Sequence, residues 1–395
     1  MSRLLRAVPG ADPLDLLAEL RTALSGIGPA LLPRAAESAN PHARPEVPQP
    51  GHPEPPSEVA KNVALVVETS GSTGAPKRVA LSSGALLASA AGTQSALGSA
   101  GQWLLSLPTH YIAGVQVLVR SITAEVDPVV LPPGAFDVDA FVEATAGFRP
   151  RVARFTSLVP TQLHRLVEAA EGDRSTRDAL RSFDGILVGG QATPSALRDR
   201  SLELGIRLIG TYGSSETAGG CVYDGAPIGT TRVEVVDGQV EIAGPTLAEG
   251  YLADPAATDA AFAVRDGLRW YRTGDAGDVT DGILRITGRL DAVIISGGEK
   301  VSLDRIEDIA RGIPGLHDAV AVSAPDPEWG ATPVVFTAAD PAIPRESALR
   351  EALIGSLGRV ASRAVLVHLQ ALPTLPSGKP DRRALAESAA VTRRP

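Results

Sequence analysis

Residues 69–77 combine glycines, hydroxyl side chains and one lysine in the order Thr69-Ser70-Gly71-Ser72-Thr73-Gly74-Ala75-Pro76-Lys77. They directly follow an apolar run, residues 63–67, that has the composition of a buried strand. The glycines let a ligand approach the backbone closely, and the hydroxyls, the N–H groups and Lys77 can bind phosphate oxygens. An ordinary polar turn is the alternative interpretation. A P-loop is disfavoured, because no Ser or Thr follows the lysine.

Around this stretch, short apolar runs alternate with stretches of helical pattern. The runs that predict strands are residues 103–107, 126–131, 151–155, 186–188 and 207–209. The stretches that predict helices are residues 84–97, 136–146, 160–169 and 194–204. This alternation predicts an α/β fold with mostly parallel sheets that are covered by helices.

The N-terminal region has two further features. Asp12 and Pro13 are typical of a helix start, and that helix should end near Gly26. Residues 33–60 are rich in proline and lack an apolar period. We therefore expect an extended Pro-rich segment on the surface there.

The C-terminal part of the sequence predicts two smaller units. Residues 229–251 switch to short strands with turns, and Asp237-Gly238 within them is a strong hairpin signal, so we expect a small β-rich subdomain. Beyond it, strands are expected at residues 292–295, 319–323, 334–337 and 365–369, and helices at residues 304–311 and 346–357. The expected organisation is a large N-terminal domain, residues 1–290, followed by a small mobile C-terminal α+β domain, residues 291–395.

Composition limits the classes of function. The formal net charge of −8 disfavours nucleic acid and anionic membrane surfaces as partners. The single cysteine, Cys221, cannot form a disulfide within the chain, which fits a reducing compartment. The sequence has neither a signal-peptide pattern nor a membrane-spanning apolar run, so a cytoplasmic protein is expected. The oligomeric state is not fixed by the sequence, and a homodimer stays open.

Residues 69–77 resemble the phosphate-binding loop of the adenylate-forming superfamily, which includes acyl-CoA synthetases, luciferases and the adenylation domains of peptide synthetases. Members of this superfamily activate a carboxylic acid with ATP. The resemblance implies that ATP is bound by Thr69, Ser70, Gly71, Ser72, Thr73, Gly74 and Lys77. Further motifs follow in the order of the superfamily.

Two motifs in the middle of the chain resemble the adenine-side elements of the superfamily. Residues 211–217 are similar to its second core motif, which implies that Tyr212 stacks on adenine and that Glu216 coordinates Mg²⁺. An aromatic face suits a base, and a carboxylate suits a hard cation. The same motif places Thr211, Gly213, Ser214 and Ser215 around the nucleotide. The other motif, residues 189–191, occupies the place of the adenine-side loop, which implies that Gly190 and Gln191 also lie beside the nucleotide.

Two further motifs resemble the ribose site and the hinge. Residues 271–275 imply that Asp275 binds both ribose hydroxyls, which suits a carboxylate with two acceptor oxygens. Residues 288–291 imply that Arg289 contacts the ribose or a phosphate and that Asp291 absorbs a domain rotation. The superfamily often has a second acid next, where this chain has Ala292.

Three more motifs imply roles in the chemistry. Residues 373–379 resemble the last motif, which places Lys379 where it would hold the carboxylate and the α-phosphate together. His110 would lie between the phosphate and acyl sites, although a histidine with only local bonds is the alternative. Gly298 would line the channel for the pantetheine arm of coenzyme A (CoA).

The compact chain, residues 295–299, the run 103–122 and residues 219–225 are together similar to the 2-succinylbenzoate–CoA ligases of menaquinone biosynthesis. ATP, Mg²⁺ and CoA are then the expected cofactors, and a small carboxylic acid is the expected substrate. A second substrate carboxylate would need a donor, for which the candidates are His110, Gln116, Arg120, Arg154, Thr156 and Ser157. Three alternatives stay open: a CoA ligase for another acid, an adenylation domain that loads a carrier protein, and a non-catalytic binding protein.

Overall fold

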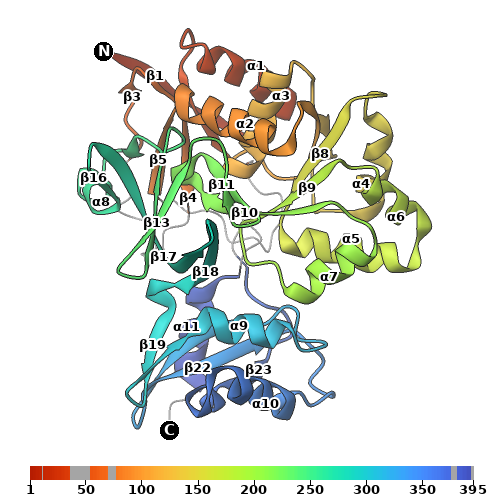
Figure 1. Cartoon of the computed structure of the whole chain (residues 1–395), viewed down its shortest axis with the longest axis vertical. Coiled ribbons are helices and arrows are strands. Elements are labelled where there is room, and N and C mark those ends of the chain that lie inside the picture. Colours follow the sequence, from red (N-terminus) through yellow and green to blue (C-terminus); the bar gives the residue numbers. More distant parts are fainter. Residues whose placement is uncertain (11, 36–53, 70–76, 375–379, 393–395) are drawn as a thin grey trace.

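The computed structural model describes residues 1–10, 12–35, 54–69, 77–374 and 380–392. These residues form three sheets in the upper part of Figure 1 and a fourth sheet in the lower part. The upper part is the large N-terminal domain and the lower part is the smaller C-terminal domain. Within the described ranges, no helix combines the length and the apolar character that crossing a membrane requires.

The first sheet has six strands in the order β15-β5-β4-β2-β1-β3. Their bounds are Ser2–Pro9 (β1), Ala30–Arg34 (β2), Glu58–Ala60 (β3), Val63–Thr69 (β4), Lys77–Ser82 (β5) and Gly250–Tyr251 (β15). β1, β2 and β4 are parallel, whereas the other pairings are antiparallel, so this sheet is mixed rather than mostly parallel. β4 and β5 must be antiparallel because residues 70–76 are too few for a crossover connection.

The N-terminal expectations are partly confirmed. The predicted helix is α1, Pro13–Leu24, and the Asp12 carboxylate accepts a hydrogen bond from the Leu14 N–H at 2.8 Å. The segment 33–60 was expected to be an extended surface segment, but both of its ends are paired into the first sheet as the strands Ala30–Arg34 and Glu58–Ala60. Residues 36–53 lie outside the described part. β1 was not predicted, because Arg3 and Arg6 interrupt its apolar residues without the period of two that a strand would show.

The second sheet has seven strands in the order β12-β11-β10-β9-β8-β6-β7. Five of them are parallel: β6 (Gly101–Leu105), β7 (Val129–Val130), β8 (Ala153–Leu158), β9 (Gly185–Val188) and β10 (Leu208–Ser214). The antiparallel strands β11 (Gly219–Tyr223) and β12 (Ala226–Pro227) complete the sheet. The strand–helix alternation predicted here is confirmed.

The helices of this region are α2 (Ser83–Leu97), α3 (Ile112–Ala124), α4 (Val138–Ala144), α5 (Pro160–Gly172), α6 (Arg174–Arg181) and α7 (Ser195–Glu203). Four of them match predicted helices, whereas α3 and α6 were not predicted. α3 is buried along most of its length. It carries two polar residues, Gln116 and Arg120, into the interior of the domain.

The third sheet contains the first two strands of the predicted β-rich subdomain, residues 229–251, and continues beyond that range, whereas β15 within the range joins the first sheet. The strands of the third sheet are β13 (Arg232–Val236), β14 (Gln239–Ala243), β16 (Phe262–Arg265), β17 (Leu268–Thr280) and β18 (Ile283–Arg289), with α8 (Pro255–Ala261) beside it. The predicted hairpin is confirmed, because Asp237 and Gly238 have φ of 51° and 80° between β13 and β14. Positive φ at both central residues is the requirement of a type I′ turn.

The fourth sheet forms the small domain. Its strands are β19 (Val293–Ser296), β20 (Glu299–Ser302), β21 (Val320–Asp326), β22 (Gly330–Thr337) and β23 (Val365–His368), and its helices are α9 (Leu303–Arg311), α10 (Glu346–Leu357) and α11 (Arg382–Thr392). All six predicted elements are present, while β20 and α11 were not predicted. This domain has hydrophobic clusters of its own. A single 3₁₀ turn, Leu290–Ala292, connects it to β18.

Candidate functional site

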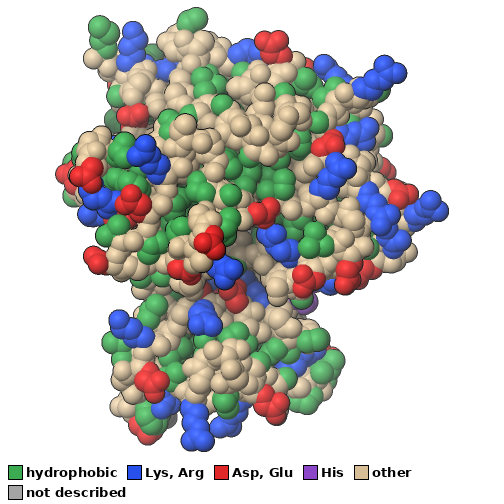
Figure 2. Space-filling model, viewed as in Figure 1, with side chains coloured by type: hydrophobic (Ala, Val, Ile, Leu, Met, Phe, Trp, Pro, Cys, Tyr) green, Lys and Arg blue, Asp and Glu red, His purple; other side chains and the backbone are tan. Residues whose placement is uncertain are grey.

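A cleft runs between the two domains, where Figure 2 shows acidic and basic side chains gathered at the waist of the molecule. Most of the predicted site residues that the structure describes line this cleft: Thr69, Lys77, His110, Gly190, Gln191, Thr211, Tyr212, Gly213, Ser214, Ser215, Glu216, Asp275 and Arg289. Predicted residues Ser70, Gly71, Ser72, Thr73, Gly74 and Lys379 lie outside the described residues. Thr374 and Pro380, on either side of the segment with Lys379, line the cleft and form a β-bridge with each other. Residues of six predicted motifs therefore meet in one place, and Thr374 adds a seventh motif, residues 373–379.

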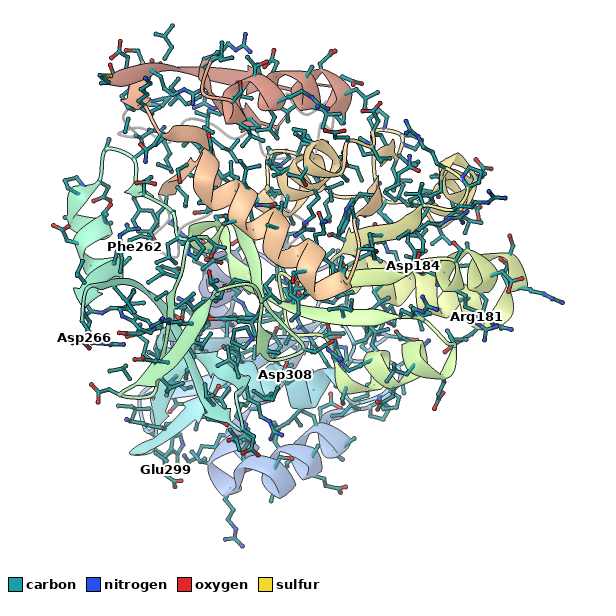
Figure 3. All side chains as sticks on the ribbon, turned by 45° about the horizontal axis from the view of Figure 1, so that its top comes forward. Arg181, Asp184, Phe262, Asp266, Glu299 and Asp308 are labelled. Carbon is teal, nitrogen blue, oxygen red and sulfur yellow. The ribbon has the colours of Figure 1, made fainter. Side chains whose placement is uncertain are left out.

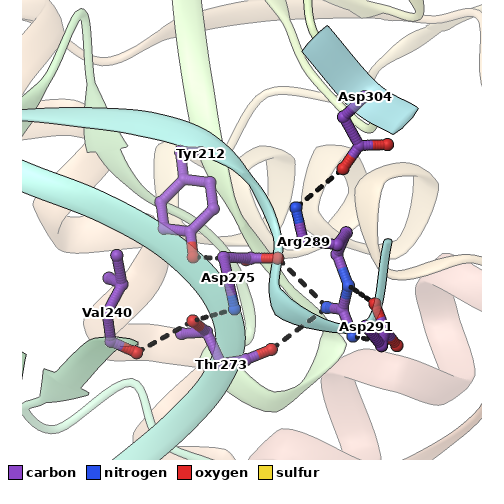
Figure 4. Close-up of polar contacts among 7 residues, drawn as sticks. All are labelled: Tyr212, Val240, Thr273, Asp275, Arg289, Asp291 and Asp304. Atoms are coloured by element: carbon purple, nitrogen blue, oxygen red, sulfur yellow. Dashed lines mark hydrogen bonds and ion pairs between the residues drawn. The ribbon is translucent and has the colours of Figure 1, made fainter. Parts of the chain in front are cut away.

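The Asp275 cluster consists of Tyr212, Thr273, Asp275, Arg289 and Asp291 (Figure 4). Asp275 and Arg289 are direct cross-strand partners on β17 and β18. The Tyr212 hydroxyl donates to Oδ2 of Asp275 at 2.6 Å, and Nη1 of Arg289 donates to Oδ1 at 3.1 Å. Burial raises the pKa of Asp275, and the hydrogen bonds from Tyr212 and Arg289 oppose this. Each carboxylate oxygen keeps acceptor capacity for a further donor.

Arg289 connects the two domains through four partners. Its side chain forms a bidentate pair with Asp291, at 3.0 and 3.1 Å, and donates to the Thr273 carbonyl at 3.1 Å. Its backbone N–H donates to Oδ2 of Asp304 on α9 at 2.7 Å. The bonds to Asp291 and the nearby Asp275 raise the pKa of Arg289, and Arg289 in turn lowers the pKa of Asp291. Arg289 is therefore a fixed cation at the edge of the cleft.

Glu216 and Lys77 both contact Tyr251. Glu216 belongs to the 3₁₀ turn Ser215–Thr217 after β10, and its buried carboxylate accepts a hydrogen bond from the Tyr251 hydroxyl at 2.9 Å. The Lys77 ammonium lies 4.8 Å from the centroid of the Tyr251 ring. Burial and the nearby Glu216 raise the pKa of Tyr251, which keeps its hydroxyl protonated.

The residues around Glu216 fit a magnesium ion that is bound together with phosphates. Among the described residues, no group of three acidic, histidine or cysteine side chains forms a metal cage. Mg²⁺ is usually held by one or two carboxylates, waters and the phosphates of its substrate. Among the same residues, only Oε1 of Glu216 has a hydrogen-bond partner, so Oε2 is available to such an ion.

Two glycines allow the backbones of the cleft to approach closely. A Cβ on Gly213 would lie 2.2 Å from the Gly219 carbonyl oxygen, and a Cβ on Gly189 would lie 2.3 Å from Oγ1 of Thr211. Gly213 also has φ of 158°, which disfavours other residues. Side chains at these positions would push β10 away from its neighbours and move Tyr212.

The Arg120 site is the buried arm of the cleft formed by Gln116, Arg120 and Ser157. Arg120 is 6% exposed, its guanidinium lies 4.7 Å from the Trp103 ring centroid, and its Nη1 is 3.5 Å from Oγ of Ser157. Gln116 donates to the Ala218 carbonyl at 2.7 Å. Two buried polar atoms, Nε of Arg120 and Oε1 of Gln116, have no hydrogen-bond partner among the described residues. Burial lowers the pKa of Arg120.

The other candidate donors lie in different surroundings. His110 lines the cleft beside Tyr111, with ring centroids 4.1 Å apart, and burial lowers its pKa, which favours the neutral imidazole. Arg154 does not line the cleft, and its guanidinium lies 5.3 Å from the Phe148 ring centroid. Thr156 donates to the Leu104 carbonyl at 2.9 Å and does not line the cleft either.

Gly298 is not brought to the cleft. It lies in the turn between β19 and β20, next to Glu299, which Figure 3 places at the outer edge of the molecule. Its φ is 84°, and a Cβ there would meet nothing within 4 Å. The implied role in a pantetheine channel therefore stays a prediction that needs another orientation of the small domain.

Three residues of the site were missed by sequence reasoning. Tyr251 and Asp304 come from segments that the sequence analysis did not connect with the nucleotide motifs, whereas Thr273 belongs to the ribose motif but was assigned no role. Thr273 lies inside a quoted motif, between Arg272 and Gly274, and its alternation along a strand was the available signal. Tyr251 and Asp304 gave no comparable signal, because their partners are distant in the sequence.

Comparisons with known proteins agree with this geometry. The profile of the AMP-binding enzyme family matches residues 17–252. A relative from Mycobacterium tuberculosis, named probable 2-succinylbenzoate–CoA ligase, is 37% identical over 337 residues, which cover 83% of this chain and 85% of the relative. The structure of an Escherichia coli MenE variant with bound OSB-AMS is similar with a TM-score of 0.73 and 25% identity, covering 98% of this chain and 88% of that one. ATP-bound MatB from Rhodopseudomonas palustris shares the fold with a TM-score of 0.77 at 20% identity, covering 97% and 88%. The chain therefore belongs to the family of AMP-binding enzymes.

Proposed function

We propose that this chain is an AMP-forming acid–CoA ligase that converts 2-succinylbenzoate into 2-succinylbenzoyl-CoA in menaquinone biosynthesis. Its relative in M. tuberculosis carries the name of this ligase, and an E. coli MenE structure with bound OSB-AMS is similar in fold. The observation that carries the proposal is the Arg120 site. A buried arginine without a carboxylate partner among the described residues is costly in the free protein, and a second substrate carboxylate would complete it.

In the first half-reaction, one carboxylate oxygen of the acid attacks the α-phosphorus of ATP. A new P–O bond forms, the bond to the β-phosphate oxygen breaks, and pyrophosphate leaves with the electron pair of that bond. Asp275 would accept both ribose hydroxyls, and Tyr212 would lie against the adenine. Lys77 would neutralise phosphate charge, and Lys379 would hold the attacking oxygen near the phosphorus.

Magnesium would be held by Glu216 together with the phosphates of ATP, and it would neutralise charge on the leaving pyrophosphate. Among the described residues, the hydrogen bond from the Tyr251 hydroxyl orients that carboxylate. The neutral form of His110, which burial favours, adds no positive charge between the phosphate and acyl sites.

In the second half-reaction, the sulfur of CoA attacks the acyl carbonyl, a C–S bond forms and AMP leaves. The thiol proton goes to solvent or to the departing phosphate. Thr374 and Pro380 line the cleft while Gly298 does not, so the described orientation supports the first half-reaction. We infer a rotation of the small domain between the two steps, with the boundary at residues 290/291 and the hinge at Asp291.

We place the enzyme in the cytoplasm, where ATP and CoA are available to it. The net charge of −8 supports small-molecule substrates in preference to nucleic acid or an anionic membrane surface. A homodimer is a further prediction, which sedimentation analysis at several protein concentrations would test.

The deciding experiment measures pyrophosphate release with ATP, Mg²⁺ and CoA for a panel of acids, with products identified by mass. The panel contains 2-succinylbenzoate, benzoate, succinate, a medium-chain fatty acid and amino acids. Preference for 2-succinylbenzoate with formation of its CoA thioester is expected. Turnover of a different acid would overturn the substrate, and acyl-adenylate formation without transfer to CoA would point to a carrier-protein acceptor.

A second experiment tests the role of Lys379. Lys379→Ala should abolish most of the adenylate formation and spare thioester formation from supplied acyl-adenylate. Lys61→Ala, at an exposed residue outside the cleft, is the control. Equal loss of both half-reactions would contradict the assigned role.

A further inference from the structure

We propose that Tyr251 is a positioning residue that holds Glu216 and Lys77 apart and orients both toward the same anionic ligand. This inference rests on the proposed function, because it concerns the site where ATP and its metal ion would bind. Three observations carry it: the backbone bonds of the Tyr251 segment, the contacts of the Tyr251 side chain, and the packing that fixes its ring.

The backbone around Tyr251 is bonded to both parts of the site. β15 pairs with β5, the strand that begins at Lys77, and the Leu252 N–H donates to the Arg78 carbonyl at 2.7 Å. A few residues earlier, the Ala248 N–H donates to the Glu216 carbonyl at 2.8 Å. Residues 248–252 therefore fix the distance between the strand that carries Lys77 and the turn that carries Glu216.

The side chain of Tyr251 contacts both charged groups. Its hydroxyl donates to Oε1 of Glu216 at 2.9 Å, and the Lys77 ammonium lies 4.8 Å from its ring centroid. A hydrogen bond to a carboxylate restricts the rotation of that carboxylate, and a cation over a ring is attracted by the negative face of the ring. Tyr251 thus orients the Glu216 carboxylate through its hydroxyl and the Lys77 ammonium through the face of its ring.

The ring itself cannot turn easily. Tyr251 is 7% exposed, and its backbone N–H donates to Oγ1 of Thr258 at 2.9 Å. The Phe262 ring, labelled in Figure 3, lies 6.1 Å from the Tyr251 ring and 5.1 Å from the Tyr271 ring, measured between centroids. These contacts make Tyr251 a rigid support rather than an adaptable one.

The consequence is that Glu216 and Lys77 are not neutralised by each other. Among the described residues, neither forms an ion pair, and Tyr251 contacts both of them. An ion pair between them would use up the charges that a phosphate and its metal ion need. The tyrosine keeps the carboxylate available to a cation and the ammonium available to a phosphate.

Tyr251→Phe tests the hydroxyl, because it removes the hydrogen bond to Glu216 and keeps the ring under Lys77. The readout is binding of Mn²⁺, in place of Mg²⁺, to the full chain with a non-hydrolysable ATP analogue, followed by electron paramagnetic resonance. We expect Mn²⁺ to bind about tenfold more weakly, while metal-free binding of the analogue is unchanged. Tyr251→Leu also removes the ring and should weaken metal-free binding as well.

Tyr223→Phe is the matched control, since it also removes a buried hydroxyl that has one partner, Thr93 at 2.8 Å. A general loss of stability would appear in both Phe variants, whereas weaker Mn²⁺ binding should appear only in Tyr251→Phe. Unchanged Mn²⁺ binding in Tyr251→Phe would overturn the inference. If the unmodified protein bound neither the analogue nor Mn²⁺, the proposed function would fail instead.

Discussion

The Asp275 cluster and the Arg120 site lie on the same cleft, but they differ in how fully their polar groups are hydrogen-bonded. In the Asp275 cluster, both oxygens of Asp275 accept hydrogen bonds, and Arg289 has partners at 3.0–3.1 Å. In the Arg120 site, Nε of Arg120 and Oε1 of Gln116 are buried without a partner among the described residues. The first region is complete before a ligand arrives and can accept more donors. The second lacks a counter-charge until an anion binds.

The largest effect is expected from breaking the complete region. Asp275→Ala removes the acceptor for both ribose hydroxyls and leaves Tyr212 and Arg289 with one partner fewer. We expect kcat/KM for ATP to fall by about 10³, because each hydrogen bond to a charged group contributes roughly 1.5–3 kcal/mol. Substrate-dependent ATP–pyrophosphate exchange measures it. Asp278→Ala, at an exposed residue of the same strand, should change it little, and a loss below tenfold in Asp275→Ala would refute the assignment.

The next largest effect is expected from the incomplete region. Arg120→Met should raise KM for a diacid substrate by about 10²-fold and leave KM for ATP unchanged. The variant should unfold no more easily than the original, because replacing a buried unpaired charge with an apolar side chain is often neutral or stabilising. Steady-state kinetics and denaturant unfolding test the two parts. Equal losses with diacids and monoacids would exclude a carboxylate-binding role.

Tyr212→Phe should have a smaller effect and sharpens the comparison within the complete region. It removes the hydroxyl that donates to Asp275 and keeps the aromatic face. The hydrogen bond from Tyr212 lowers the pKa of Asp275 against the rise caused by burial, so its loss should raise that pKa further. The acidic limb of the pH profile of kcat/KM for ATP should then shift to higher pH, with a loss of roughly threefold to tenfold at neutral pH. An unshifted limb would contradict this reasoning.

The smallest effect is expected at a contact outside both regions. His164 of the large domain and His317 of the small domain stack with ring centroids 4.7 Å apart. Burial and the neighbouring His317 lower the pKa of His164, while Glu168 and Glu171 oppose this shift and Arg200 adds to it. The unfolded chain therefore binds a proton at higher pH than the folded one. The contribution of neutral His164 to the free energy of unfolding is complete above about pH 6.5, and it is lost as the pH falls through the lowered pKa of the folded protein.

His317→Gln should reduce this pH dependence. The slope of the unfolding free energy between pH 7 and pH 5 should become smaller, by no more than about 1 kcal/mol over the range. The pKa of His164, followed by NMR, should move up toward its ordinary value. His368→Gln is a matched control, because His368 packs within the small domain.

Sequence reasoning reached the complete region more fully than the incomplete one. Asp275, Arg289, Tyr212 and Glu216 lie in short motifs, so each could be assigned from its neighbours in the chain. Arg120 could be put forward only as one of several donors, since its burial depends on α3 packing into the domain. Tyr251 could not be found at all, because its partners at Lys77 and Glu216 are far from it in sequence. The antiparallel pairing of β4 and β5 follows from their short connection, but it could not be anticipated because β5 itself was not predicted.

Arg289 has one more consequence, which concerns the energy of domain movement. Its side chain is bonded within the large domain and to Asp291, while its backbone N–H is bonded to Asp304 in the first turn of α9. The proposed rotation about Asp291 has to break the bond to Asp304. If the small domain rotates as proposed, this bond to a charged acceptor, worth roughly 1.5–3 kcal/mol, favours the described orientation by tenfold or more. The enzyme would then favour the orientation that supports its first half-reaction, and the bond between Arg289 and Asp304 would have to break before the second.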